Sequence, residues 1–224
     1  MSYFLKNPGI IWGLLLEHLQ MTSLTLFLSV LVALPLALLI ARYRWLNVPV
    51  LGTLGILYTI PSLALIILLV PVFGLNAKSV VAAMVLYTQV ILVRNLAVGL
   101  IAIEPDILEA AKAMGMNGWQ RWWYVQLPLV LPIFLAGLRV AAIVAIAIAS
   151  IGAKFSAGGL GKLLFDGIAQ GRYDKIWAGT IAITLLAFTI NGILLLMQYW
   201  VDPIKQRSVQ ERRPKKQSFF TTRR

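Results

Sequence analysis

Cysteine is absent from the 224-residue sequence, and His18 is its only histidine. Without cysteine, the chain can build no disulfide bond, no thiolate metal site and no cysteine nucleophile. His18 stands at the edge of an apolar run, where a lone histidine is not a credible zinc ligand or catalytic base. These absences remove the usual side chains of metal centres and of cysteine or histidine catalysis.

Charged residues are also scarce. They make up 12% of the sequence, whereas hydrophobic residues make up 60%. A soluble domain of this length cannot bury so much apolar surface in one core. The composition therefore predicts an integral membrane protein whose solvent is the lipid bilayer.

The formal net charge of +12 is concentrated at one end of the chain, because eight of the twenty Lys and Arg residues follow Trp200. A nucleic-acid-binding protein would instead spread its basic residues along one soluble face, so no nucleic-acid partner is expected. The distribution indicates a basic cytoplasmic tail over residues 204–224. We expect residues 208–224 to be disordered on the anionic inner leaflet.

Five apolar runs are long enough to cross a bilayer as helices of about 20 residues. The second run contains Pro49, Pro61 and Pro71, whose missing amide protons predict a bend. A simple kink is the favoured interpretation, and an unwound segment whose backbone lines a pathway is the alternative. The predicted fold class is an all-α polytopic membrane protein with about five transmembrane helices. The runs are Leu19–Ala41, Val48–Phe73, Ser79–Ile103, Leu129–Ile151 and Ile176–Val201.

The distribution of Lys and Arg between loops predicts the orientation, since these residues accumulate on the cytoplasmic side. With the carboxy terminus inside, the inner side collects twelve basic residues and the outer side six. We therefore expect the amino terminus outside and the carboxy terminus in the cytoplasm. Residues 1–17 would form an extracytoplasmic or interfacial segment, and residues 18–203 the transmembrane domain, with a cytoplasmic loop at residues 104–128.

This loop begins with a short helix whose two ends are marked. Pro105 suits a first helical turn, and the acidic residues on either side of it place negative charge at the positive end of the helix dipole. Gly115 supplies a stop, because it can adopt the left-handed conformation that closes a helix. One apolar face is kept shallow by alanines, so we expect another protein's groove to approach it. That face consists of Ile107, Ala110, Ala111 and Met114.

A second short helix is expected from Trp119 to Gln126, after the Asn117-Gly118 turn. Its aromatic residues suit the headgroup level of a membrane, so the loop should lie flat on the inner surface. Leu127-Pro128 would then open the fourth span.

The spacing in this loop resembles a known motif. Glu109-Ala110-Ala111, three further residues, Gly115, and eleven residues to Leu127-Pro128 look like the EAA loop of ABC importer permeases. In that family the loop is the coupling helix, which sits in a cleft of a cytoplasmic ATPase. The resemblance implies a type I ABC importer permease in the bacterial cell membrane. Taken without the resemblance, the segment is an ordinary amphipathic linker between spans.

The same resemblance implies the partners of the chain. They are a second permease subunit, identical or paralogous, two cytoplasmic ABC ATPases and an extracytoplasmic substrate-binding protein, assembled in the lipid bilayer. This chain itself should bind no cofactor, because ATP and magnesium belong to the ATPase. The Gly161-Lys162 pair is not a phosphate loop, since Ser156 and Leu163 replace the required glycine and hydroxyl residue.

The resemblance covers roughly residues 18–203, and two further motifs resemble one subgroup of these permeases. Val93-Arg94-Asn95 and the glycine segment Ala157-Gly158-Gly159-Leu160-Gly161 look like the permeases of osmoprotectant importers, which carry glycine betaine, carnitine and choline. Lys154 and Lys162 depart from that pattern. An amino-acid or methionine importer permease is the alternative within the same class.

Several further residues are candidates for a structural or pathway role. Arg94 and Asn95 lie within the third run, where an arginine must face protein, water or the interface; a contact with the coupling loop is one interpretation and snorkelling the other. Tyr58 and Tyr87, together with Phe73, could present aromatic faces to a quaternary ammonium, although packing is the stronger expectation. Pro61 marks the bend in the second run.

A membrane-embedded channel or enzyme is the alternative from a different class. Such an enzyme would need histidine, cysteine or paired acids in its spans, and a channel would need a self-sufficient pore. The runs contain no Asp or Glu, which also argues against a proton-coupled carrier.

Overall fold

The computed structural model describes residues 2–201. All regular secondary structure in this range is helical, which confirms the predicted all-α class. The basic tail predicted over residues 204–224 lies outside the described residues, and so does its expected disorder.

Four helices are long and apolar enough to cross a membrane, and a bent helix pair supplies a fifth candidate span. The long helices are α2 (Pro8–Arg42), α5 (Ala77–Ile101), α8 (Leu127–Gly152) and α10 (Tyr173–Val201). The bent pair is α3 (Asn47–Thr59) and α4 (Ser62–Phe73). The shorter helices are α1 (Ser2–Lys6), α6 (Pro105–Ala113), α7 (Gly118–Arg121) and α9 (Gly161–Ala169).

The second span is broken, and the expected simple kink is wrong. The α3 and α4 helices meet at 97° across a break of a few residues. Pro61 has no amide proton, and a residue that precedes proline is restricted to extended backbone. Ile60 accordingly has a ψ angle of 126°, which ends α3. Pro61 is also extended, with a ψ of 134°, and α4 begins after it. Each half is about 20 Å long or less, too short to cross the hydrocarbon alone.

The first long helix begins before the apolar run that predicts it. It starts at Pro8 and runs through the boundary placed after residue 17, so residues 8–17 are its first turns. The preceding helix α1 is held by Tyr3, which is buried beneath two cations. Arg172 Cζ lies 5.3 Å and Lys175 Nζ 5.5 Å from the centroid of its ring.

The second half of the 104–128 loop does not form a separate helix. The chain is helical from Gly118 to Phe155 without a break, so Leu127-Pro128 lies inside a continuous helix rather than at the start of a new one. A π-helical turn at Trp122–Gln126 makes this continuity possible: the Leu127 N–H bonds to the Trp122 carbonyl, five residues back. Pro128 has no N–H for a normal α-helical bond, and such a turn accommodates the loss.

The helix pair α5 and α8 forms the centre of the bundle, and glycines bring the two backbones close together. A Cβ added to Gly137 would lie 2.7 Å from the Asn95 Cβ, and one added to Gly152 would lie 2.5 Å from Val80. Helix α2 packs on the same α5 through buried polar groups: the Ser29 and Thr88 hydroxyls are 2.6 Å apart. Small residues and hydroxyl pairs of this kind are typical of helix association in membranes.

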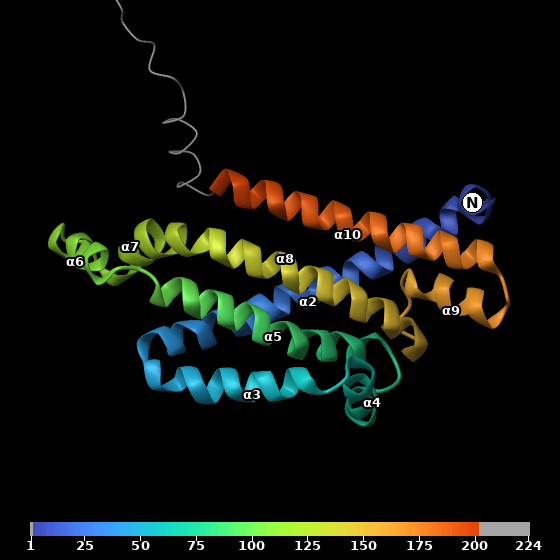
Figure 1. Ribbon diagram of the computed structural model, residues 1–224, viewed down its shortest axis with the longest axis horizontal. Helices are drawn as coiled ribbons and strands as arrows, with labels where there is room; N and C mark the ends of the chain where they lie inside the picture. Colours follow the sequence, from blue (N-terminus) through green and yellow to red (C-terminus); the bar gives the residue numbers. More distant parts are fainter. Residues whose placement is uncertain (1, 202–224) are drawn as a thin grey trace, which may run out of the picture.

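Figure 1 shows that the long helices run side by side and that their connections gather at two opposite ends. One end, here called the α6 end, holds α6, α7, the turn after α2 and the last turns of α10. The opposite end, the α9 end, holds α1, α4 and α9. The loop with the EAA-like motif and the carboxy-terminal end of α10 therefore lie on the same side, as the predicted topology requires.

Replacing Gly137 by valine should lower the stability of the bundle. The added methyl groups meet the Asn95 side chain across the α5–α8 contact, and overpacking of this kind costs about 1–3 kcal/mol. The measurement is the thermal unfolding temperature of the purified protein in detergent. Gly192→Val is the matched control, because a Cβ there has no heavy atom within 4 Å. Equal unfolding temperatures for the two variants would contradict the proposed close packing.

Candidate functional site

Helix α6 forms as predicted, and its charges follow the helix dipole. It begins at Pro105 directly after Glu104, whose backbone is extended. Asp106 lies in the first turn and Lys112 in the last turn. Negative charge at the amino end and positive charge at the carboxy end both stabilise a helix of this length. A nine-residue helix is therefore maintained on an exposed connection.

Gly115 ends this helix in a left-handed conformation with φ of +82°. The Gly115 N–H bonds to the Lys112 carbonyl at 2.9 Å, and the Met116 N–H bonds to the Ala111 carbonyl at 3.2 Å. A Cβ at Gly115 would have nothing within 4 Å, so space does not require glycine here. The backbone conformation alone requires it.

Helix α6 exposes a narrower apolar surface than the sequence predicts. Glu109, Ala110 and Gly115 are exposed, as are Ile107 and Met114. Ala111, in contrast, is only 2% exposed, so its inclusion in the outward face is wrong. One residue of helix turns the side chain by about 100°, which carries Ala111 away from Ala110 and into the chain's own packing. Ala111 anchors the helix, and its neighbours are available to a partner.

The turn into α7 is fixed by a reciprocal capping box. The Asn117 side chain accepts from the Gln120 N–H, and the Gln120 side chain accepts from the Asn117 N–H, both at 2.9 Å. Beyond it, the rings of Trp119 and Trp123 lie 5.5 Å apart on an exposed surface. Exposed aromatic residues at one end of a bundle suit the membrane interface.

Of the polar pair on α5, Asn95 has a packing role. It is half-buried, donates from Nδ2 to the Ile91 carbonyl at 2.8 Å, and packs against Gly137 of α8. The Arg94 side chain is exposed and forms no hydrogen bond or ion pair with any residue in the described range 2–201. The structure therefore provides no polar contact between Arg94 and the 104–128 loop.

The structure brings Tyr58 and Tyr87 together at the broken span. Their ring centroids are 5.2 Å apart with the planes tilted by 52°. Tyr87 is buried on α5, whereas Tyr58, near the end of α3, is 42% exposed. Pro61 follows at the break and is exposed. The aromatic pair packs at the break, and only the Tyr58 ring is available at the surface.

The glycine segment is a tight contact between α2 and α8 at the α9 end. Gly158 and Gly159 have φ of +81° and +79°, and the Gly159 N–H donates to Glu17 Oε2 at 2.8 Å. A Cβ at Gly159 would lie 3.1 Å from His18 Nδ1, and one at Gly161 would collide with the Ser150 carbonyl oxygen. The glycines are therefore required both for backbone conformation and for space.

Sequence reasoning missed the partners of this segment. His18, predicted to lie at a membrane edge, is completely buried beside Gly159. Within residues 2–201 no cluster of three or more metal-ligating side chains occurs. Glu17, the last residue of the predicted interfacial segment, instead anchors the glycine segment to α2. The only signal in the sequence was an acidic residue next to the sole histidine at the start of an apolar run.

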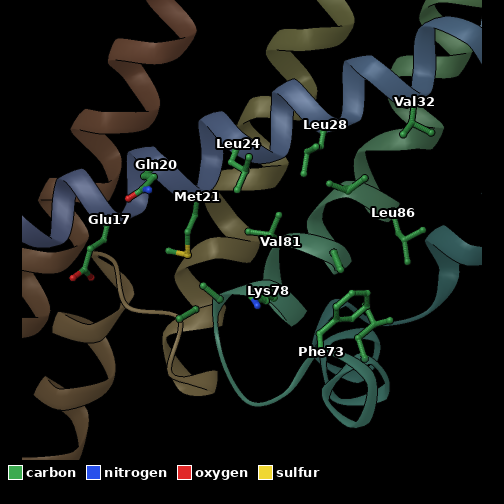
Figure 2. Close-up of a pocket in the computed structure, with 15 residues that line it drawn as sticks. Glu17, Gln20, Met21, Leu24, Leu28, Val32, Phe73, Lys78, Val81 and Leu86 are labelled. Atoms are coloured by element: carbon green, nitrogen blue, oxygen red, sulfur yellow. The ribbon is translucent and has the colours of Figure 1, made fainter.

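A groove of about 760 Å³ lies between α2, α4 and α5 (Figure 2). Its polar lining residues are Glu17 and Gln20 on α2 and Lys78 in the first turn of α5. The rest of the lining is apolar and includes Phe73, at the end of α4. No pattern in the sequence predicts this groove, because its walls come from three separate segments. The remaining lining residues are Met21, Leu24, Leu28, Val32, Leu69, Ala77, Val81, Ala82, Val85, Leu86 and Ala157.

Comparison with known proteins places these features in context. Residues 33–206 match the family described as binding-protein-dependent transport system inner membrane component. The chain is 36% identical to the osmoprotectant import permease protein OsmW of Salmonella typhimurium, over 90% of this chain and 96% of that protein. It is also 36% identical to the glycine betaine/carnitine/choline transport system permease protein OpuCD of Bacillus subtilis, over 92% of this chain and 90% of that protein.

The fold is similar to that of a solved transporter. The MetNI methionine ABC transporter, in an inward-facing conformation, matches with a TM-score of 0.77 over 87% of this chain and 97% of that chain. A second crystal form of the same transporter gives a TM-score of 0.75. Sequence identity to the two is 19% and 18%, so these matches establish the fold alone.

Replacing Gly161 by alanine should loosen the glycine segment. The new Cβ collides with backbone at Ser150, which cannot move aside as a flexible side chain can, and we expect a loss of about 1–3 kcal/mol. The measurement is the unfolding temperature in detergent, together with proteolysis of the 153–161 connection. Gly13→Ala on α2 is the control, since a Cβ there meets nothing within 4 Å. Unchanged stability and cleavage in Gly161→Ala would contradict this packing.

Proposed function

Because this chain belongs to the binding-protein-dependent transport system inner membrane component family, we propose that it is the permease subunit of an importer for quaternary-amine osmoprotectants. As a member of that family it is a multi-pass inner-membrane transport subunit and not an enzyme; ATP is hydrolysed by a separate subunit in these systems. The proposal adds the substrate class and the mode of coupling.

The substrate proposal is supported by the relatives at 36% identity. Their names specify osmoprotectants in one case, and glycine betaine, carnitine and choline in the other. The alternative of a methionine importer is supported only by a solved transporter at 19% identity, a level that carries the fold and not the substrate. Quaternary amines are therefore the favoured substrates.

Coupling to the ATPase would occur through helix α6. The observation that carries this proposal is a short exposed helix with an EAA-like sequence, anchored by buried Ala111 and closed by left-handed Gly115. The exposed side chains of Ile107, Ala110 and Met114 offer a shallow apolar surface to a groove. Glu109 adds an exposed carboxylate beside it. Movement of α6 would reach the bundle through the continuous helix that begins at α7.

The complete transporter would contain a second permease subunit, identical or paralogous, two ATPases at the α6 end and a substrate-binding protein at the α9 end. Helix α10 is largely exposed at the surface of this chain, because only 6% of its most apolar 18-residue segment is buried. We propose that the solute path lies between two permeases, that ATP binding favours the outward-open state, and that hydrolysis resets it. ATP and magnesium would be held by the ATPase, with no cofactor on this chain.

Copurification separates this proposal from a channel or a membrane-embedded enzyme. An importer subunit extracted in mild detergent should bring an ATPase chain with it. A channel or an enzyme that acts alone should be isolated without one.

Replacing Gly115 by valine should abolish uptake while membrane insertion is retained. A side chain at φ of +82° costs roughly 1–2 kcal/mol and distorts the end of α6, so ATP hydrolysis should be uncoupled from transport. The measurements are uptake of radiolabelled glycine betaine, ATPase activity and the amount of protein in the membrane. Gly118→Val, three residues away with ordinary backbone and free space, is the control. Undiminished uptake in Gly115→Val would count against α6 as the coupling element.

The proposed orientation predicts which thiols can be labelled from outside. Because the sequence has no cysteine, one introduced cysteine is the only reactive thiol in the chain. In sealed right-side-out vesicles, a membrane-impermeant maleimide should label exposed Lys162→Cys at the α9 end immediately. It should label exposed Lys112→Cys on α6 only after detergent is added. Labelling of Lys112→Cys in intact vesicles would reverse the orientation.

A further inference from the structure

The groove between α2, α4 and α5 carries one acidic and one basic side chain on facing helices. Figure 2 shows Glu17 on α2, and Lys78 and Phe73 across the groove from this helix. No ion pair forms between Glu17 and Lys78: within residues 2–201, the described ion pair joins Arg172 and Asp174. Opposite charges that line one cavity without neutralising each other are complementary to a ligand that carries both charges.

Glu17 and Lys78 each keep capacity for a ligand. The Gly159 N–H occupies only Oε2 of the Glu17 carboxylate. The Lys78 backbone N–H donates to the Asn76 side chain, which caps the start of helix α5. The Lys78 ammonium is exposed and forms no hydrogen bond with any other residue of the described chain. An ammonium group has three donors, and a carboxylate accepts such bonds well.

The apolar part of the groove distinguishes between kinds of cation. A primary ammonium carries three N–H donors that must be satisfied when water is removed. A quaternary ammonium has no N–H and is covered by methyl groups, so contact with leucine and valine side chains leaves no donor unpaired. This lining therefore suits a methylated cation better than the ammonium of an ordinary amino acid.

We propose that this groove is a binding site for zwitterionic quaternary amines, in which Glu17 attracts the methylated ammonium and Lys78 the carboxylate. The site deepens the proposed function and depends on it. The occupant is the transported solute, chosen on charge complementarity. A lipid molecule or a second copy of this chain are the competing occupants, and the experiment is designed to separate them.

The test compares uptake of two solutes by the assembled transporter with its own ATPase and binding protein. Glycine betaine carries a carboxylate, whereas choline carries the same trimethylammonium group and no carboxylate. Lys78→Gln should lower the uptake of glycine betaine relative to choline by about tenfold, the effect of replacing a charge-assisted hydrogen bond with a neutral one. Glu17→Gln should lower the uptake of both solutes to a similar extent.

Two features make these variants informative about charge. The glutamine in Glu17→Gln still offers an oxygen to the Gly159 N–H, so the glycine segment keeps its anchor while the charge is lost. Lys162→Gln removes an exposed lysine from the same end of the molecule, outside the groove, and should change neither uptake nor the ratio. Protein amounts in the membrane are measured for each variant.

The outcomes are distinct. An unchanged glycine betaine to choline ratio in Lys78→Gln overturns the site, whether both uptakes are normal or both fall equally, as they would if the groove held lipid or a second subunit. Normal choline uptake in Glu17→Gln also overturns it. If the wild-type transporter hydrolyses ATP but takes up neither solute, the substrate class itself is wrong, and the groove proposal falls with it.

Discussion

The lipid bilayer offers no hydrogen-bond partner to a backbone amide, and this constraint controls the form of the chain. Each apolar run therefore becomes helical over nearly its whole length. Proline removes an amide proton from this pattern. Pro35, Pro71 and Pro132 lie inside continuous helices, but at two other prolines the helix changes its form. At Pro61 the helix breaks and turns by 97°. At Pro128 a π-helical turn lets the helix continue. One span is therefore broken, whereas the second half of the 104–128 loop continues without a break into another span.

Helix association then depends on how closely backbones approach, because lipid is as apolar as the helix surfaces. Gly137 and Gly152 set the distance between α5 and α8, and the Ser29–Thr88 contact joins α2 to them. At the α9 end, Gly161 fits against the backbone of α8. The bundle core thus consists of three closely packed helices, α2, α5 and α8, with α10 packed against α8 and the broken span against α5.

This arrangement connects the two ends of the molecule. Helix α6 lies at one end and leads, through its capped turn, into the helix that runs to the glycine segment at the other. The glycine segment is bonded to Glu17 of α2, which also lines the groove. The capped turn, one long helix and one hydrogen bond thus connect α6 with the proposed solute site.

The sequence alone determined the features that arise from local chemistry. The membrane class, the number of spans and the helix before Gly115 all followed from apolar run length, proline and glycine. Features that combine distant segments were missed or wrong: Ala111 faces inward, His18 is buried, and the groove with Glu17 and Lys78 was not foreseen. The length of the apolar runs indicates how much of the chain enters lipid. The burial of a residue, and which charged side chains face each other, depend on which helices become neighbours. Only the tertiary structure decides that, because the contacts that select neighbours join residues far apart in the chain.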